Sequence, residues 1–224
     1  MEPKLRIIRK KKSEAENAHL DPLMRALKAL HSAGAPESMT AEELERQRRS
    51  QEVLGKLTAP MTGMDYEEFA LSGMSAAWTR LKAPHGSRHA ILYCHGGGYT
   101  SGNLGYSRVL SSKLAHATGY DVLSFEYRLA PEYPFPIGFY DCYMAAKAMY
   151  TNQFILNTDP DKITLIGDSA GGNLAAAVSL MARDQGEFLP KRQILIYPAV
   201  NNDYSEESPY LSVRRYGTEY LLTC

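Results

Sequence analysis

The stretch Lys162–Gly172 reads Lys-Ile-Thr-Leu-Ile-Gly-Asp-Ser-Ala-Gly-Gly. Its first half has the length and residue types of a buried strand, and the residues after Ser169 open a helical pattern. A serine between two glycines, where a strand turns sharply into a helix, has its hydroxyl exposed above the edge of a sheet. Gly167 and Gly171 lack the side chains that would collide across such a turn. The stretch predicts a strand–helix unit with Ser169 as candidate nucleophile; the alternative is a glycine-rich helix entry that binds phosphate.

The same alternation of apolar strands and amphipathic helices continues on both sides of this unit. We expect strands at 65–70, 75–81, 89–94, 120–127, 162–166 and 193–197, and helices at 106–117, 138–150 and 173–183. Strands separated by helices are typical of a mostly parallel sheet with crossover helices. The sequence therefore predicts an α/β fold.

The first 60 residues have a different character, because they are charged and helical. Asp21-Pro22 is a helix start signal, and apolar residues recur at helical spacing after it. Thr40-Ala41-Glu42-Glu43 is a capping-box pattern that opens a second helix. Two amphipathic helices of this size cannot form a core alone, so we expect them to lie on a larger body.

A second glycine-rich motif, His95-Gly96-Gly97-Gly98, follows the expected strand at 89–94. Acyl transfer requires N–H donors where the tetrahedral oxyanion forms, and one such donor contributes about 3 kcal/mol. Backbone without Cβ can approach a substrate closely, so Gly97 and Gly98 are predicted donors, together with the N–H of Ala170. The alternative is a flexible loop, but two motifs in the correct order on the correct elements favour an oxyanion hole.

These motifs identify a resemblance. The matching stretches are His95-Gly96-Gly97-Gly98-Tyr99, Tyr127-Arg128-Leu129-Ala130-Pro131-Glu132-Tyr133-Pro134-Phe135-Pro136, Asp141, Gly167-Asp168-Ser169-Ala170-Gly171-Gly172-Asn173 and Tyr197-Pro198. The chain resembles the hormone-sensitive-lipase-like esterases of the α/β-hydrolase superfamily, which include many bacterial carboxylesterases. The resemblance implies an α/β-hydrolase core at 61–224, a helical cap segment at 1–60, short to medium acyl esters as substrates, and no cofactor or metal.

The resemblance also assigns roles around the site. We expect Tyr99 to line the acyl or alcohol pocket. The Tyr-Arg-Leu-Ala-Pro-Glu segment looks structural in this family, so Arg128, Glu132 and Asp141 are expected to be buried ionic supports, since such residues are rarely buried unless paired.

The catalytic acid and histidine are the missing parts of the pattern. This fold orders its triad as serine, acid, histidine, yet all six histidines precede Ser169: His19, His31, His85, His89, His95 and His116. Asp203 follows the expected strand at 193–197, but an acid of this family would come one strand later, and six strands are found where the fold normally has eight. We therefore expect the core to be incomplete at its C-terminus and residues 1–224 alone to be inactive, with a complementary C-terminal polypeptide as a partner.

Composition narrows the remaining choices. Acidic and basic residues balance at 25 each, which does not suit a nucleic-acid partner. No apolar run is long enough to span a membrane. Three scattered cysteines give neither a zinc spacing nor a disulfide framework, which favours a cytoplasmic location.

Two other functions stay open at this level. A non-catalytic small-ligand receptor on the same fold would also lack a base, although Ser169 and the Gly97-Gly98 loop favour an enzyme. An amidase or peptidase would use the same residues as an esterase. The sequence specifies neither the physiological substrate nor the oligomeric state, and a homodimer is one option.

Overall fold

The computed structural model describes residues 40–57, 59–83, 89–151, 159–200 and 207–210. The helix expected after Asp21-Pro22, His19, His31 and His85, and nearly all of the chain after Val200 lie outside these residues. Residues 40–200 belong to one compact unit.

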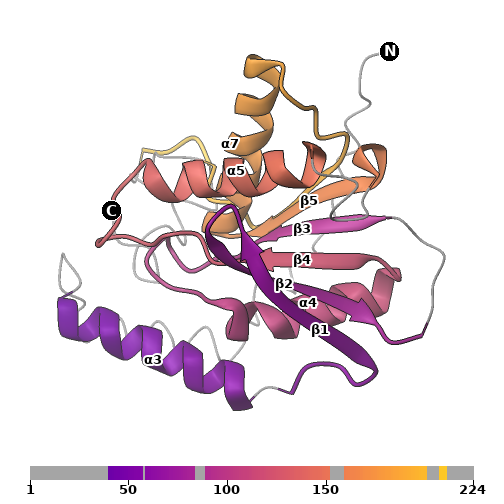
Figure 1. The fold of residues 1–224 in the computed structure, drawn as a ribbon. Coiled ribbons are helices and arrows are strands. Elements are labelled where there is room, and N and C mark those ends of the chain that lie inside the picture. Colours follow the sequence, from indigo (N-terminus) through magenta and orange to yellow (C-terminus); the bar gives the residue numbers. More distant parts are fainter. Residues whose placement is uncertain (1–39, 58, 84–88, 152–158, 201–206, 211–224) are drawn as a thin grey trace, which may run out of the picture. The chain divides into compact units, whose positions relative to one another are not determined.

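The described unit alternates strands and helices along the chain (Figure 1). In order, the elements are α3 (Ala41–Leu57), β1 (Met64–Leu71), β2 (Met74–Leu81), β3 (Ala90–Cys94), α4 (Leu104–Thr118), β4 (Asp121–Phe125), α5 (Ile137–Thr151), the short 3₁₀ helix η1 (Pro160–Lys162), β5 (Ile163–Asp168), α7 (Ala170–Gln185) and β6 (Gln193–Ile196). All six expected strands are present within a few residues of their predicted ends.

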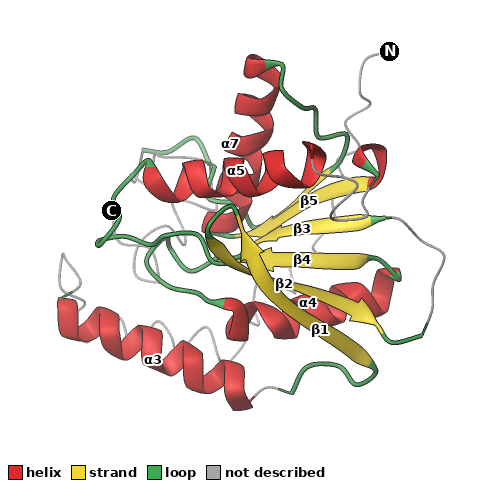
Figure 2. Ribbon diagram, viewed as in Figure 1, coloured by secondary structure: helices red, strands yellow, loops and turns green. Residues whose placement is uncertain are grey.

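The strands form one sheet in the order β1-β2-β4-β3-β5-β6; β2, β4, β3 and β5 can be followed side by side in Figure 2. β1, β2 and β4 pair antiparallel, whereas β4, β3, β5 and β6 run parallel. The predicted α/β class is confirmed. Because β3 and β5 are parallel neighbours, the two glycine motifs that follow them meet at the same edge of the sheet.

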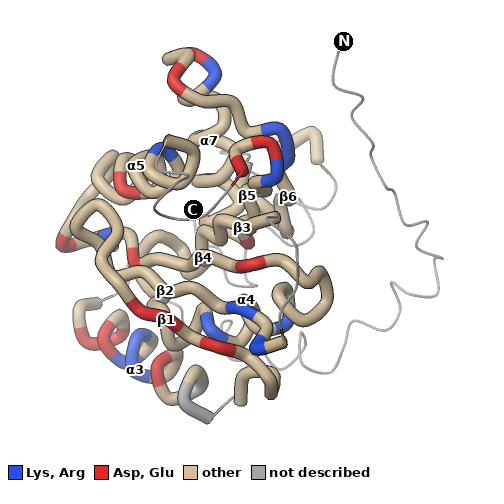
Figure 3. Tube along the Cα trace, turned by 45° about the vertical axis from the view of Figure 1, so that its right-hand side comes forward, with Lys and Arg blue, Asp and Glu red and all other residues tan. Residues whose placement is uncertain are grey.

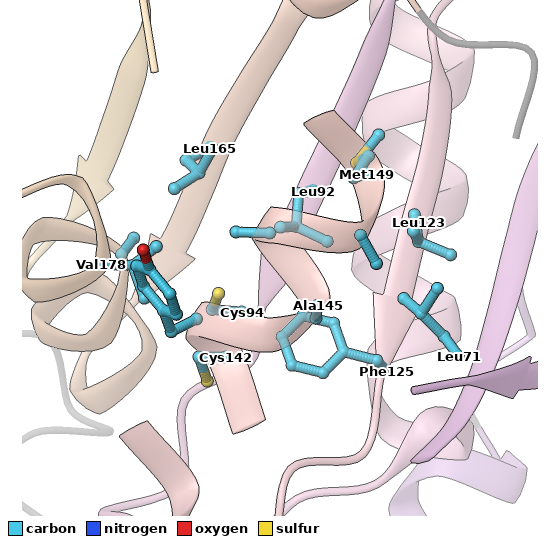
Figure 4. Packing of buried hydrophobic residues seen from close by; sticks show 14 of the residues in the cluster. Leu71, Leu92, Cys94, Leu123, Phe125, Cys142, Ala145, Met149, Leu165 and Val178 are labelled. Atoms are coloured by element: carbon cyan, nitrogen blue, oxygen red, sulfur yellow. The ribbon is translucent and has the colours of Figure 1, made fainter. Parts of the chain in front are cut away.

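Alternate residues of β3 pack on opposite faces of this sheet, as the pleat of a strand requires. Leu92 and Cys94 join the larger hydrophobic cluster, which α5 and α7 cover; part of it is seen in Figure 4. Ile91 and Tyr93 join the smaller cluster, which α4 covers on the other face. This burial on both faces holds the end of β3, and with it the loop that follows, in a fixed position.

Helix α3 begins where the capping-box pattern predicts. The N–H of Glu43 donates to Thr40 Oγ1 at 3.2 Å, and the N–H of Thr40 donates to Glu43 Oε2 at 2.8 Å. The helix packs on α4 and carries acidic and basic residues along its length (Figure 3). Helix α3 therefore lies in the same compact unit as the sheet.

Candidate active site

Ser169 occupies the elbow, which is the strained turn at residues 167–171 between β5 and α7. Its φ of 53° and ψ of −121° are rare for a residue with a side chain. Its N–H donates to the Ile196 carbonyl at 2.9 Å, and its own carbonyl accepts from Asn173 and Ala199. Backbone contacts with β6 and α7 therefore hold the serine in this conformation, and its side chain is half-buried rather than enclosed.

The glycines around Ser169 are required by the closeness of the backbone. A Cβ added to Gly167 would lie 2.1 Å from the Gly171 carbonyl oxygen. A Cβ added to Gly171 would lie 2.1 Å from the Cys94 carbonyl oxygen and 2.5 Å from that of His95. The start of α7 thus packs directly on the end of β3, which brings together the two motifs found in the sequence.

Helix α7 begins at Ala170, three residues before the expected start at Asn173. Gly171 and Gly172 are poor helix formers, so residue preference alone does not place them inside a helix. In the structure both are helical: a Cβ on Gly171 would meet the Cys94 carbonyl at the end of β3, and a Cβ on Gly172 would meet Pro198. The Ala170 N–H is among the first of the helix, whose initial donors have no partner within the helix and attract negative charge.

The loop after β3 turns back on itself at the glycines. Gly97 and Gly98 have φ values of 127° and 61°, and Tyr99 also has a positive φ, of 64°. The Gly97 carbonyl accepts hydrogen bonds from the N–H groups of Thr100 and Ser101, at 3.2 and 3.0 Å. These bonds point the Gly97 carbonyl into the turn.

Asp168 holds this loop to the elbow, a role that the sequence reasoning missed. Its Oδ1 accepts from the Gly96 N–H at 2.9 Å and from the Tyr93 hydroxyl at 2.7 Å. The Tyr197 hydroxyl donates to Oδ2 at 3.4 Å. Burial, and then the Asp168 charge, raise the pKa of Tyr93, which therefore stays a donor. The sequence signal that could have indicated this role is an acidic residue at the buried end of a strand, between Gly167 and Ser169.

His95 supports this loop through its ring and its carbonyl. Its Nδ1 lies 2.8 Å from the Gly96 carbonyl oxygen, and its ring stacks on Tyr127 with centroids 4.3 Å apart. The Tyr127 hydroxyl donates to the His95 carbonyl at 2.8 Å. Burial lowers the pKa of His95, so the ring is neutral at neutral pH and donates from Nδ1.

The expectation of three buried ionic supports is correct only for Asp141. Its side chain is 9% exposed and pairs with Arg128, which donates from Nε at 2.9 Å and from Nη2 at 2.7 Å. The side chain of Arg128 is 51% exposed, and that of Glu132 is 53% exposed. In each ion pair one side chain is the more buried, Asp141 in one and Arg48 in the other, while its partner stays hydrated at the surface. Glu132 pairs with Arg48 of α3, a partner that lies far away in the sequence.

The Arg48–Glu132 pair gives a pH-dependent prediction. Hydrogen bonds from Arg48 lower the pKa of Glu132 from 4.5 to about 2. A carboxyl with a lowered pKa in the folded state stabilises the fold above its ordinary pKa, and this contribution disappears as the pH falls toward about 2. At neutral pH the melting temperature of wild type should therefore exceed that of Glu132→Gln, and this difference should shrink as the pH falls below 4.5. Glu45→Gln is the control, because Glu45 lies on α3, the helix that carries Arg48. A constant difference across this range would contradict the assignment.

A pocket of about 360 Å³ opens beside the loop and the elbow helix. Its walls are formed by Gly98, Tyr99, Thr100, Tyr127, Arg128, Ala130, Tyr133, Phe135, Gly138, Phe139, Asn173, Leu174 and Ala177. Tyr99 lies in the wall of this pocket; its expected role, to line the pocket for the acyl or alcohol group, stays a prediction. Aromatic and small apolar residues make up most of the wall, which suits an apolar group better than a charged one.

The histidines of the described residues do not meet Ser169. His89 precedes β3 and stacks on Tyr120, and His116 lies in the last turn of α4. Both positions are at the edge of the sheet where the parallel strands begin, opposite the elbow. His95 lies near the elbow, but its ring is enclosed and its Nδ1 is bound to Gly96.

Within the described ranges, no group of three or more His, Cys, Asp or Glu side chains is arranged to hold a metal ion. None of the helices in this part of the chain is both long and apolar enough to cross a bilayer.

The comparisons with known proteins agree with this geometry. Residues 91–224 match a family described as having the alpha/beta hydrolase fold. An ethyl acetate hydrolase of Pseudomonas putida is 32% identical over 216 residues, covering 92% of this chain and 67% of that enzyme. A hyperthermophilic esterase from the archaeon Pyrobaculum calidifontis is 35% identical with a TM-score of 0.73, covering 92% of this chain and 67% of that one.

A solved esterase of the bacterial hormone-sensitive lipase family is 30% identical with a TM-score of 0.66. The match covers 84% of this chain and 61% of that esterase. An arylesterase of Saccharolobus solfataricus is 39% identical, and the match spans 42% of its length. The shared sheet, the elbow and the extent of these matches lead to one conclusion: the chain belongs to the α/β-hydrolase fold family, and within it to the esterases related to hormone-sensitive lipase.

Proposed function

We propose that the protein is a carboxylic ester hydrolase for short to medium acyl esters, with Ser169 as its nucleophile. The observation that supports this most is the packing of Gly171 on the carbonyls of Cys94 and His95. This packing puts the N-terminus of α7 beside the loop that carries Gly97 and Gly98. A hydroxyl on a strained turn, flanked by N–H donors from two elements, suits acyl transfer.

The reaction would proceed in two steps. A base removes the proton from Ser169 while Oγ attacks the ester carbonyl carbon, and the oxyanion is held by the N–H groups of Gly97, Gly98 and Ala170. The bond to the alcohol oxygen then breaks, the alcohol takes up the proton, and the acyl group stays on Oγ. Water attacks this acyl-enzyme in the same way, which releases the acid and restores the serine.

We propose that the triad acid and histidine do not come from the described residues. The three described histidines lie at the opposite edge of the sheet or are enclosed, as His95 is. A base placed after Ser169 in the chain order of this fold would belong to a complementary C-terminal polypeptide segment, because all six histidines precede Ser169. Residues 1–224 alone would then hydrolyse esters only slowly, so turnover has to be measured on the intact protein, which is residues 1–224 together with that segment.

The substrate class and location are also part of this proposal. The aromatic pocket beside Tyr99 has room for an apolar acyl or alcohol group of modest size. The name of the Pseudomonas putida relative, an ethyl acetate hydrolase, supports small esters as substrates. Cys94 and Cys142 are buried free thiols, which is consistent with a reducing, cytoplasmic environment (Figure 4).

Two glycine substitutions test the oxyanion loop. A Cβ on Gly97 would lie 2.2 Å from the Ser101 carbonyl oxygen, whereas a Cβ on Gly98 has no neighbour closer than 3.9 Å. Gly97→Ala should therefore displace the loop and lower kcat for p-nitrophenyl butyrate about a hundredfold or more. Gly98→Ala has room for its Cβ and keeps its N–H. It should therefore cost only the backbone strain of its positive φ, about 1–2 kcal/mol. Equal turnover in the two variants would show that this loop is not part of the active site.

A further inference from the structure

Arg48 lies on α3, far in sequence from the motifs of the site, yet its guanidinium reaches them. Its Nε donates to the Thr100 carbonyl at 2.7 Å, and its Nη2 donates to the Ala130 carbonyl at 2.9 Å. Both terminal nitrogens also bind the Glu132 carboxylate, at 2.7 and 2.8 Å. One side chain thus joins a helix to two separate loops.

Both backbone acceptors of Arg48 belong to the wall of the pocket. Thr100 closes the turn in which its own N–H donates to the Gly97 carbonyl. The neighbouring residue Tyr99 accepts a hydrogen bond from the Ala130 N–H at 2.9 Å. Arg48 therefore binds on both sides of the contact that joins the glycine loop to the segment after β4.

A simple surface ion pair would not have this geometry. Arg49, the next residue on α3, pairs with Glu45 one turn earlier on the same helix, and its side chain is 73% exposed. The side chain of Arg48 is 30% exposed and directs donors to two carbonyl groups as well as to Glu132. A planar guanidinium can serve several fixed acceptors at once, which a lysine ammonium on a flexible stem cannot reproduce.

We propose that Arg48 is a positioning residue for ester hydrolysis. From α3 it fixes the backbone of residues 97–101, so that the N–H groups of Gly97 and Gly98 stay oriented to donate hydrogen bonds to the oxyanion. This inference rests on the proposed function. Donors of this kind act on the transition state and are sensitive to small displacements. Loss of Arg48 should therefore lower kcat and leave KM nearly unchanged.

The kinetic test compares neighbouring arginines of α3. Arg48→Ala should lower kcat for p-nitrophenyl butyrate about tenfold or more, with KM within about twofold. Arg48→Lys keeps the charge and the aliphatic stem and should be nearly as slow; it also provides the test if the alanine variant is unstable. Arg49→Ala should behave as wild type. Full activity in Arg48→Ala, or full rescue by Arg48→Lys, would overturn the proposal.

Hydrogen exchange separates this inference from the proposed function. Amides of residues 98–101 should exchange faster in Arg48→Lys than in wild type, while Arg49→Ala should match wild type at these positions. If wild type proves not to hydrolyse esters, the proposed function fails, and exchange still decides whether Arg48 holds the loop. Unchanged exchange in the Arg48 variant would show that it does not.

Discussion

Replacing Ser169 by alanine should abolish ester hydrolysis while leaving the fold intact. The β-carbon of alanine fits wherever that of serine does, and the N–H bond to Ile196 is kept because it comes from the backbone. In a well-studied serine hydrolase, loss of the nucleophile lowers kcat about a millionfold, and a drop of that order is expected here.

The measurement is the turnover of p-nitrophenyl butyrate by the intact protein, together with its thermal unfolding. Ser179→Ala is a matched control, since Ser179 lies on α7, which follows Ser169, and its hydroxyl donates to the Ala175 carbonyl of the same helix. This variant should keep wild-type turnover. A Ser169→Ala variant within about tenfold of wild type would mean that another residue carries the acyl group.

Gly171→Ala should have the largest effect on stability. The added Cβ would meet two backbone carbonyl oxygens, of Cys94 and His95, at 2.1 and 2.5 Å. Neither can move away cheaply, because Cys94 is paired within the buried strand β3 and the Tyr127 hydroxyl binds the His95 carbonyl. The clash should lower the free energy of unfolding by about 3 kcal/mol or more and move α7 away from β3.

The other end of the same helix offers the control for this substitution. Gly186 follows α7 with a φ of 65°, and nothing lies within 4 Å of an added Cβ. Gly186→Ala should therefore cost only about 1–2 kcal/mol of backbone strain. Urea unfolding of both variants measures the difference. Similar losses in the two would show that the approach of α7 to β3 is not tight.

The strand positions could be predicted because their residues are buried in a simple pattern. Buried parallel strands such as β3 and β5 appear in sequence as short apolar runs, and the glycines after them mark where backbone passes close to backbone. The motif at Gly167–Gly172 thus predicted the turn, whereas the contact of Gly171 with the end of β3 came only from the structure. The start of α7 was placed late, since two glycines usually weaken a helix; the contact of Gly171 with β3 and that of Gly172 with Pro198 explain them.

The roles of Asp168 and Arg48 could not be predicted in the same way. Each depends on partners brought together by the fold: Gly96 and Tyr93 for Asp168, and two backbone carbonyls for Arg48. A sequence pattern carries residue types and spacing along the chain, whereas these contacts join segments more than 50 residues apart. The same reason explains why Glu132 was expected to be buried and is instead a surface partner of Arg48.

The central claim is that Ser169 carries the acyl group, and covalent labelling tests it most directly. A fluorophosphonate reacts with an activated serine hydroxyl and leaves a stable adduct on Oγ. The intact protein should take up one phosphonyl group, mass spectrometry of its peptides should place the group on Ser169, and turnover should fall in proportion to labelling. Complete loss of turnover with the adduct on a different residue, or full turnover with Ser169 fully labelled, would contradict the assignment.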